Sequence, residues 1–112
     1  MLTILLRCRD LEETREFYKS VLGFSVRDTA EQTLTVELHG GALIFTSGDI
    51  WEGPLGLSGT IYFTVPNVDG YYETVKDNVA VAWPLQDMPH GSREFGITDC
   101  NGYHVAFQSQ QA

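Results

Sequence analysis

Few side chains in this sequence of 112 residues combine a chemically active type with a placement that could serve a site. His104 can exchange a hydrogen bond with a ligand or bind a metal, and Glu94 offers a carboxylate for either task. With Glu37 or His39 they would make an unusual metal site. A solvated histidine at the mouth of a cleft and a salt bridge within a sheet account for the same residues, so both interpretations stay open.

The two cysteines give no sign of a nucleophile. Cys8 and Cys100 lack the C-x-x-C spacing of zinc and redox sites and are too few for a disulfide framework, so we expect two free thiols. The sequence contains no G-x-S-x-G, P-loop, H-E-x-x-H or dinucleotide-binding motif. We therefore predict no catalytic residue and no cofactor.

Arg7 and Trp51 are better candidates for contact with a ligand. Arg7 lies in an alternating segment and can pair with Glu94 or with an anionic group of a ligand. Trp51 lies in a loop, residues 47–58, that is rich in Gly and Pro and offers an aromatic ring little to pack against. We expect Trp51 to contact a ligand or a second subunit.

The composition excludes several classes of partner. Fifteen acidic against seven basic residues give a formal charge of −8, which repels nucleic acid and anionic membrane surfaces. No apolar run approaches the ~18 residues of a membrane span, and the first residues do not resemble a secretory leader. We expect a cytoplasmic protein whose partner is a neutral or cationic small molecule.

Hydrophobic periodicity predicts a strand, a helix and three further strands in each half of the chain. In the first half the helix begins after Asp10, an N-cap with Glu13 three residues on, and ends at Gly23. In the second half Asn67 takes the place of Asp10 as the cap. The predicted strands are residues 2–8, 24–27, 34–38, 42–46, 60–65, 79–83, 93–98 and 103–108.

The two halves repeat one another, and this is the strongest structural inference from the sequence. One constant offset places Thr3 on Thr60 through the first strand and helix of each half, and a slightly larger offset places Phe45 on Ala106 near the end. We therefore predict an α+β fold with two tandem βαβββ modules.

The modules are expected to form a single domain of residues 1–112. Module one covers about residues 1–47 and module two about 59–110, joined by a loop of about 48–58. One helix covers only one face of four strands, so the uncovered faces are expected to form a curved, mixed-sheet half-barrel around a ligand cleft. Alternation along the strands directs Thr3, Leu5, Arg7, Thr60, Tyr62, Thr64, His104, Ala106 and Gln108 toward that cleft.

Two motifs carry a family resemblance over the whole chain. The first is Arg9-Asp10-Leu11-Glu12-Glu13-Thr14 with Phe17-Tyr18 and Leu22-Gly23-Phe24, and the second is Gly91-Ser92-Arg93-Glu94-Phe95 with Asp99-Cys100-Asn101-Gly102. They resemble the vicinal oxygen chelate superfamily, which includes glyoxalase I, the extradiol dioxygenases and the bleomycin resistance proteins. Cys100 stands where that family usually has proline, and Asn101-Gly102 should still form the turn.

The resemblance also places the positions at which metal-dependent members hold their ion. Those members use His, Gln or Glu, one each on the first, fourth, fifth and eighth strands, and the corresponding residues here are Thr3, Phe45, Thr60 and Ala106. None of these offers an imidazole, carboxylate or thiolate donor. The resemblance therefore implies that the metal site of the family is missing.

Two functions follow from the resemblance. The first is a non-catalytic, homodimeric binding protein of the bleomycin resistance type that sequesters an aromatic ligand, which can also be cationic. The alternative is a metal-dependent lyase, isomerase or dioxygenase with displaced ligands, which requires a register error of at least one residue. An accessory domain without a ligand is a third possibility. The predicted ligand-binding residues are Thr3, Leu5, Arg7, Phe45, Trp51, Thr60, Tyr62, Glu94, His104 and Ala106.

Overall fold

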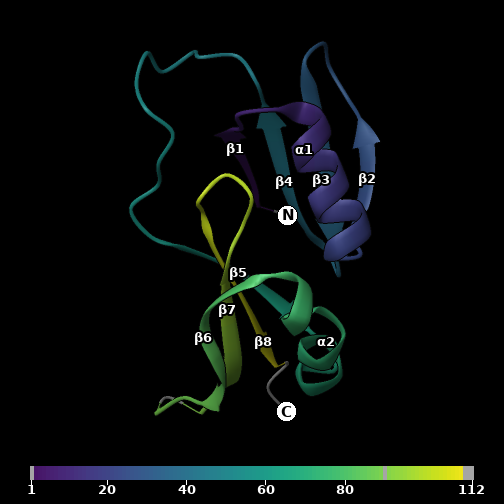
Figure 1. Ribbon diagram of the computed structural model, residues 1–112, viewed down its shortest axis with the longest axis vertical. Helices are drawn as coiled ribbons and strands as arrows, with labels where there is room; N and C mark the ends of the chain where they lie inside the picture. Colours follow the sequence, from purple (N-terminus) through teal and green to yellow (C-terminus); the bar gives the residue numbers. More distant parts are fainter. Residues whose placement is uncertain (1, 90, 110–112) are drawn as a thin grey trace. The chain divides into compact units, whose positions relative to one another are not determined.

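Each half of the chain folds as a strand, a helix and three strands, as the repeat predicts (Figure 1). The computed structural model describes residues 2–89 and 91–109. The chain divides into two units, Met1–Gly56 and Leu57–Ala112, and the boundary falls within the predicted loop of residues 48–58. The α+β class and the two tandem modules are confirmed.

The first unit is a four-stranded mixed sheet with one helical layer. It contains β1 (Thr3–Arg7), α1 (Leu11–Glu16) with a π-helical turn (Phe17–Val21), β2 (Ser25–Asp28), β3 (Thr33–Leu38) and β4 (Gly41–Thr46). The strand order is β1-β4-β3-β2. The β1/β4 pair is parallel and the other two pairs are antiparallel.

The helix of the first unit begins where its capping residue predicts. Asp10 is extended, and its Oδ1 accepts a hydrogen bond of 2.9 Å from the backbone N–H of Glu13. The cap satisfies one of the amide donors that the first turn of any helix leaves without an intrahelical partner. The π-helical turn then carries the helical backbone to Gly23, whose φ of +76° ends it, as predicted.

Replacing Asp10 with alanine is expected to lower the free energy of unfolding by about 1 kcal/mol, because the N–H of Glu13 loses its acceptor. Asp10→Ser is the matched control, since its hydroxyl oxygen can accept the same bond. Urea titration followed by circular dichroism measures both variants. Equal destabilisation by alanine and serine would show that the cap contributes nothing.

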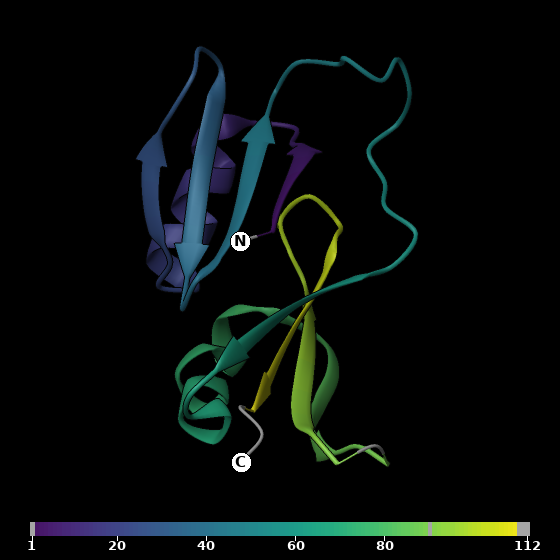
Figure 2. The same ribbon diagram turned by 180° about the vertical axis from the view of Figure 1, so that it is seen from behind.

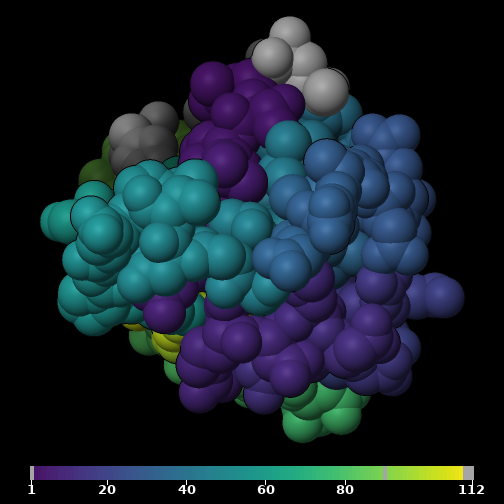
Figure 3. All heavy atoms as spheres, turned by 90° about the horizontal axis from the view of Figure 1, so that it is seen from above, coloured from purple at the N-terminus to yellow at the C-terminus, as the bar shows by residue number. Residues whose placement is uncertain are grey.

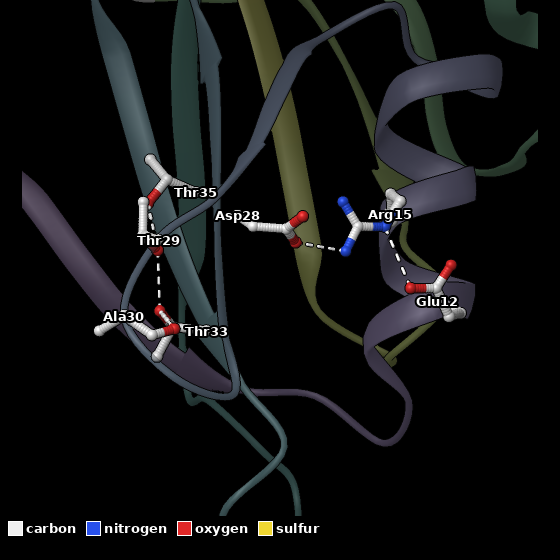
Figure 4. A network of polar contacts seen from close by, with 7 residues as sticks. All are labelled: Glu12, Arg15, Asp28, Thr29, Ala30, Thr33 and Thr35. Atoms are coloured by element: carbon white, nitrogen blue, oxygen red, sulfur yellow. Dashed lines mark hydrogen bonds and ion pairs between the residues drawn. The ribbon is translucent and has the colours of Figure 1, made fainter.

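Aromatic rings fill the space between the helix and the sheet of the first unit. Tyr18 is fully buried, and its ring centroid lies 5.1 Å from that of Phe24 and 5.2 Å from that of Phe45. At the edge of this layer Arg15 pairs with Asp28 of β2 and with Glu12 on its own helix (Figure 4). These contacts hold the helix against β2 and β4.

The second unit repeats the architecture with the strand order β5-β8-β7-β6 (Figure 2). Its elements are β5 (Thr60–Val65), α2 (Val68–Val75) with a 3₁₀ turn (Lys76–Asn78), β6 (Ala80–Asp87), β7 (Arg93–Thr98) and β8 (His104–Ser109). The side chain of Asn67 accepts from the N–H of Gly70 at 3.1 Å and caps α2, as predicted. The β5/β8 pair is parallel, like β1/β4.

Four rings form the core of the second unit. Phe107 is fully buried, with ring centroids 4.8 Å from Tyr71 of α2, 5.3 Å from Phe95 and 5.9 Å from Phe63. The core therefore lies between α2 and one face of the sheet. Burial raises the pKa of Tyr71 far above its ordinary value, because an ionised phenolate would lose its hydration there.

The sixth strand is longer than predicted. The predicted strand of residues 79–83 stops just before Pro84, but β6 continues to Asp87. β6 lies at the edge of its sheet, where a missing N–H breaks no ladder, and its pairing with β7 shifts register on both sides of Trp83. No helix within residues 2–89 and 91–109 is long and apolar enough to cross a membrane.

Candidate functional site

Each sheet has one face that its own helix does not cover, and we call it the uncovered face of that unit. In the second unit, strand register places Thr60, Tyr62 and Thr64 of β5 beside His104, Ala106 and Gln108 of β8, and these beside Glu94, Gly96 and Thr98 of β7. Their neighbours Ile61, Phe63, Val105 and Phe107 are buried on the helix side. The predicted orientation of β5 and β8 is confirmed.

A buried carboxylate organises this face. Glu94 is only 1% exposed, and its Oε2 accepts a hydrogen bond of 3.1 Å from the hydroxyl of Tyr62 and another of 3.1 Å from Nε1 of Trp83. Tyr62 comes from β5 and Trp83 from β6, which are the two edges of the sheet. One oxygen atom thus fixes the polar ends of two aromatic side chains from opposite edges.

Small residues make room for these rings at the centre of the sheet. Gly96 and Ala106 are register partners on adjacent strands. A Cβ at Gly96 would overlap atoms Cε2 and Cζ2 of Trp83, so the indole lies directly over this glycine. Tyr62 is the register partner of Ala106. These small residues therefore leave space on the face of the sheet where the two rings lie.

His104 completes the group, which we call the Glu94 cluster: Tyr62, Trp83, Glu94 and His104. The imidazole of His104 meets the Trp83 ring edge to face, with centroids 6.0 Å apart and an interplanar angle of 87°. Tyr62 is 47% exposed, so its ring is open to solvent. Desolvation, and then the hydrogen bond to Glu94, raise the pKa of Tyr62, which keeps the phenol neutral and donating.

The uncovered face of the first unit bears a different arrangement. Register places Thr3, Leu5 and Arg7 of β1 beside Ala42, Ile44 and Thr46 of β4 on this face. Arg7 Nη1 lies 3.2 Å from Oδ1 of Asp49 and donates to the backbone oxygen of Gly53. Arg7 therefore ties the loop after β4 to the sheet. Trp51, between these two anchor points, is 52% exposed.

Figure 3 shows that the teal atoms, which include the loop after β4, form a broad exposed area beside the purple atoms of the N-terminal segment. The exposed side chain of Trp51 is accessible to a ligand or a second subunit.

Replacing Arg7 with methionine is expected to free this loop while lowering the free energy of unfolding by less than about 1 kcal/mol, because a partly exposed ion pair contributes little. Fluorescence anisotropy of Trp51 in a Trp83→Phe background should fall as the loop gains motion. Arg27→Met is the matched control, since it removes the exposed Arg27–Glu37 pair on the same sheet. An unchanged anisotropy in Arg7→Met would contradict the tether.

Phe45 does not lie on an uncovered face, and this prediction is wrong. Its ring is fully buried against Tyr18 on the helix side. β1 pairs Leu5 with Ile44 as β5 pairs Tyr62 with Ala106, so Ile44 is the structural counterpart of Ala106. The second offset of the repeat was one residue too small in this region, and one residue moves a strand side chain to the opposite face.

The corrected set of positions does not fit a metal ion. Thr3 and Ile44 lie on the uncovered face of the first unit, and Thr60 and Ala106 on that of the second; each pair offers one hydroxyl and one alkyl group, which are poor donors for a divalent ion. Glu37, one of the proposed displaced ligands, pairs with Arg27 at 2.9 Å beside a shallow hollow that also includes Ser25. Within the part of the chain that the structure describes, no group of three or more His, Cys, Asp or Glu gathers as a metal site would require.

Apart from Trp51, which lies in the loop after β4, the predicted site residues fall into three groups. Tyr62, Glu94 and His104 come together in one cluster, and Thr60 and Ala106 share their face. Thr3, Leu5 and Arg7 share the face of the first unit, and Phe45 is in the core. The sequence favours packing in the core or at a sheet edge for Trp83; β6 is an edge strand, and the position of the indole over Gly96 was not predicted. The only feature of the sequence that relates to this position is the lack of a side chain at Gly96. Its meaning depends on the strand register, which the sequence does not give.

Comparisons with known proteins agree with this architecture. The sequence profile of the family described as Glyoxalase/Bleomycin resistance protein/Dioxygenase superfamily matches residues 1–107. No curated protein matches the sequence.

Several solved structures share the fold at low sequence identity. A superfamily member from Sphaerobacter thermophilus superposes with a TM-score of 0.80 at 22% identity, over 96% of this chain and 94% of that one. A protein of unknown function from Agrobacterium tumefaciens gives 0.80 at 19% identity, over 99% and 94%. TioX from Micromonospora gives 0.79 at 19% identity, over 98% of both chains. At these identities the likeness shows the fold alone.

Proposed function

Because the chain belongs to the glyoxalase/bleomycin resistance protein/dioxygenase superfamily, we propose that it is a non-catalytic protein that binds a small organic molecule containing an aromatic ring. One observation carries this proposal. The residues at the positions of the family's metal ligands are Thr3, Ile44, Thr60 and Ala106, and none supplies a strong donor for a divalent ion. The metal-assisted isomerisation, lyase and dioxygenase reactions need such an ion as Lewis acid.

The Glu94 cluster supports the binding role. Tyr62 and Trp83 present aromatic surface, and their polar ends are already satisfied by Glu94, so a ligand does not have to order them on binding. Aromatic surface that is fixed in advance suits a flat organic molecule, which stacks on it without specific hydrogen bonds.

Titration with a panel of flat aromatic compounds tests the proposal. At least one compound is expected to quench Trp83 fluorescence in a Trp51→Phe background and to raise the melting temperature. Replacing Tyr62 with alanine should weaken that binding by about tenfold, as the loss of one stacking ring predicts. Thr64→Ala, on the same strand and face, is the matched control and should bind as the parent does. A panel without any binder would overturn the proposal.

We also propose that the protein works as a homodimer, with Trp51 as a contact. The support is its exposure in a loop and the membership of the superfamily, in which bleomycin resistance proteins are dimeric. Light scattering at several concentrations tests this, with Trp51→Ala as the variant. A monomeric mass at all concentrations would contradict it.

A further inference from the structure

We infer that Glu94 is the specificity-determining residue of the uncovered face of the second unit, and that it makes this face prefer an organic cation over a neutral molecule of the same shape. The inference rests on the proposed function, because it needs a ligand to lie against Tyr62 and Trp83. It adds the charge of that ligand and the residue that selects it.

The carboxylate of Glu94 is buried within the sheet. Glu94 is on β7, an inner strand of the sheet, and it is 1% exposed beneath side chains from β5 and β6. Water therefore screens its charge much less than it screens a surface carboxylate. A ligand on the rings above it would lie within the reach of that charge.

This carboxylate is coupled to the two rings. Oε2 of Glu94 accepts from the hydroxyl of Tyr62 and from Nε1 of Trp83, both at 3.1 Å. An aromatic ring carries negative charge on its faces, and a ring that donates a hydrogen bond to an anion becomes richer in electrons. Both rings therefore offer a more negative face than an isolated phenol or indole would.

The carboxylate and the rings act on a ligand according to its charge. A cation within about 6 Å of a ring centroid is attracted by the face of the ring, and here the carboxylate at the polar end of the ring adds an attraction of the same sign. A neutral molecule of equal shape gains only the stacking. An anion would meet both the ring faces and the carboxylate with the wrong sign, and the formal charge of −8 would slow its approach.

The pair acridine and N-methylacridinium tests this inference directly. The two are nearly the same shape, and in mildly alkaline buffer acridine is neutral while N-methylacridinium carries a permanent positive charge. Calorimetric or fluorescence titration of the unmodified protein should give at least about tenfold tighter binding of the cation. In Glu94→Gln this preference should fall by about tenfold, while the affinity for acridine changes less than about twofold.

Glu94→Gln is suitable because its amide oxygen can still accept from Tyr62 and Trp83, and circular dichroism and thermal unfolding verify that it folds. A second variant tests the same inference if Glu94→Gln does not fold. Tyr62→Phe keeps the half-exposed ring and removes only its bond to Glu94, so it should weaken binding of the cation by a few fold and leave acridine unchanged.

The outcomes separate this inference from the proposed function. Equal binding of acridine and N-methylacridinium, or a preference that survives Glu94→Gln, would overturn the charge selection and leave the binding function in place. Failure of both probes to bind would overturn the charge selection, and only failure of the whole aromatic panel would also overturn the proposed function. Binding of the cation at least about tenfold tighter than that of acridine, with this preference lowered about tenfold in Glu94→Gln, is the result that we expect.

Discussion

Replacing Phe107 with alanine is expected to lower the free energy of unfolding by about 3–5 kcal/mol, the range for deleting a fully buried aromatic ring. Phe107 lies at the centre of the second core, with Phe63, Tyr71 and Phe95 around it. Because one of these rings is on α2 and two are on other strands, the cavity would loosen the helix and the sheet together. The effect approaches the whole stability of an ordinary small domain.

Urea titration followed by Trp83 fluorescence in a Trp51→Phe background measures this loss in the second unit. Gln108→Ala is the matched control, since the next residue of β8 faces the other way and makes only an exposed hydrogen bond to Thr64. The control is expected to cost less than about 0.5 kcal/mol. Similar losses for Phe107→Ala and Gln108→Ala would mean that the assigned faces of β8 are wrong.

A methyl group added at Gly96 is expected to disrupt the Glu94 cluster from beneath. Gly96→Ala would place its Cβ within the space of the Trp83 indole, so the ring must move and its hydrogen bond to Glu94 must lengthen or break. Forcing such a shift in a packed region costs about 1–3 kcal/mol. Binding of the aromatic ligands should weaken as well, because Trp83 is no longer held by the carboxylate.

Gly56→Ala is the control for this substitution, since nothing lies within 4 Å of a Cβ built at that glycine. Its effect on stability and binding should be within error of zero. Thermal unfolding and the near-ultraviolet dichroism of the indole report on Gly96→Ala. An unchanged indole signal together with unchanged stability would contradict the placement of Trp83 over Gly96.

Much of the fold could be predicted from the sequence because the signals involved are local. Asp10 and Asn67 mark helix starts through contacts with amides only three residues away. The alternation of Val105 and Phe107 with His104 and Ala106 assigns the faces of β8 without knowledge of its neighbours. These parts of the prediction are confirmed.

The errors arose where the answer depends on pairing between strands. Phe45 was placed by counting along a repeat whose loops differ in length, and a miscount of one residue reversed its face. The consecutive apolar residues Ala42, Leu43, Ile44 and Phe45 of β4 give no alternation that could correct the count. The family resemblance indicated that one metal-ligand position lies on the fourth strand. It did not give the register of that strand, and therefore not the residue.

The hydrogen bond of Trp83 to Glu94 was not predicted for a related reason. Pro84 is a strand-ending signal in a central strand, but β6 is an edge strand, and which strands form the edges is a property of the whole sheet. The hydrogen bond from Trp83 to Glu94 spans two strands that pair with shifted register. Such a contact has no signature in the sequence of either strand.

Metal retention tests the central claim most directly, because the claim separates an organic-ligand binder from the metal-dependent members of its superfamily. The untagged protein is incubated in turn with nickel, zinc, manganese and ferrous iron, desalted, and measured by elemental mass spectrometry. The absence of donors at Thr3, Ile44, Thr60 and Ala106 predicts that no ion is retained in stoichiometric amount. Retention of about one ion per chain would contradict the account and assign the chain to metal-assisted chemistry.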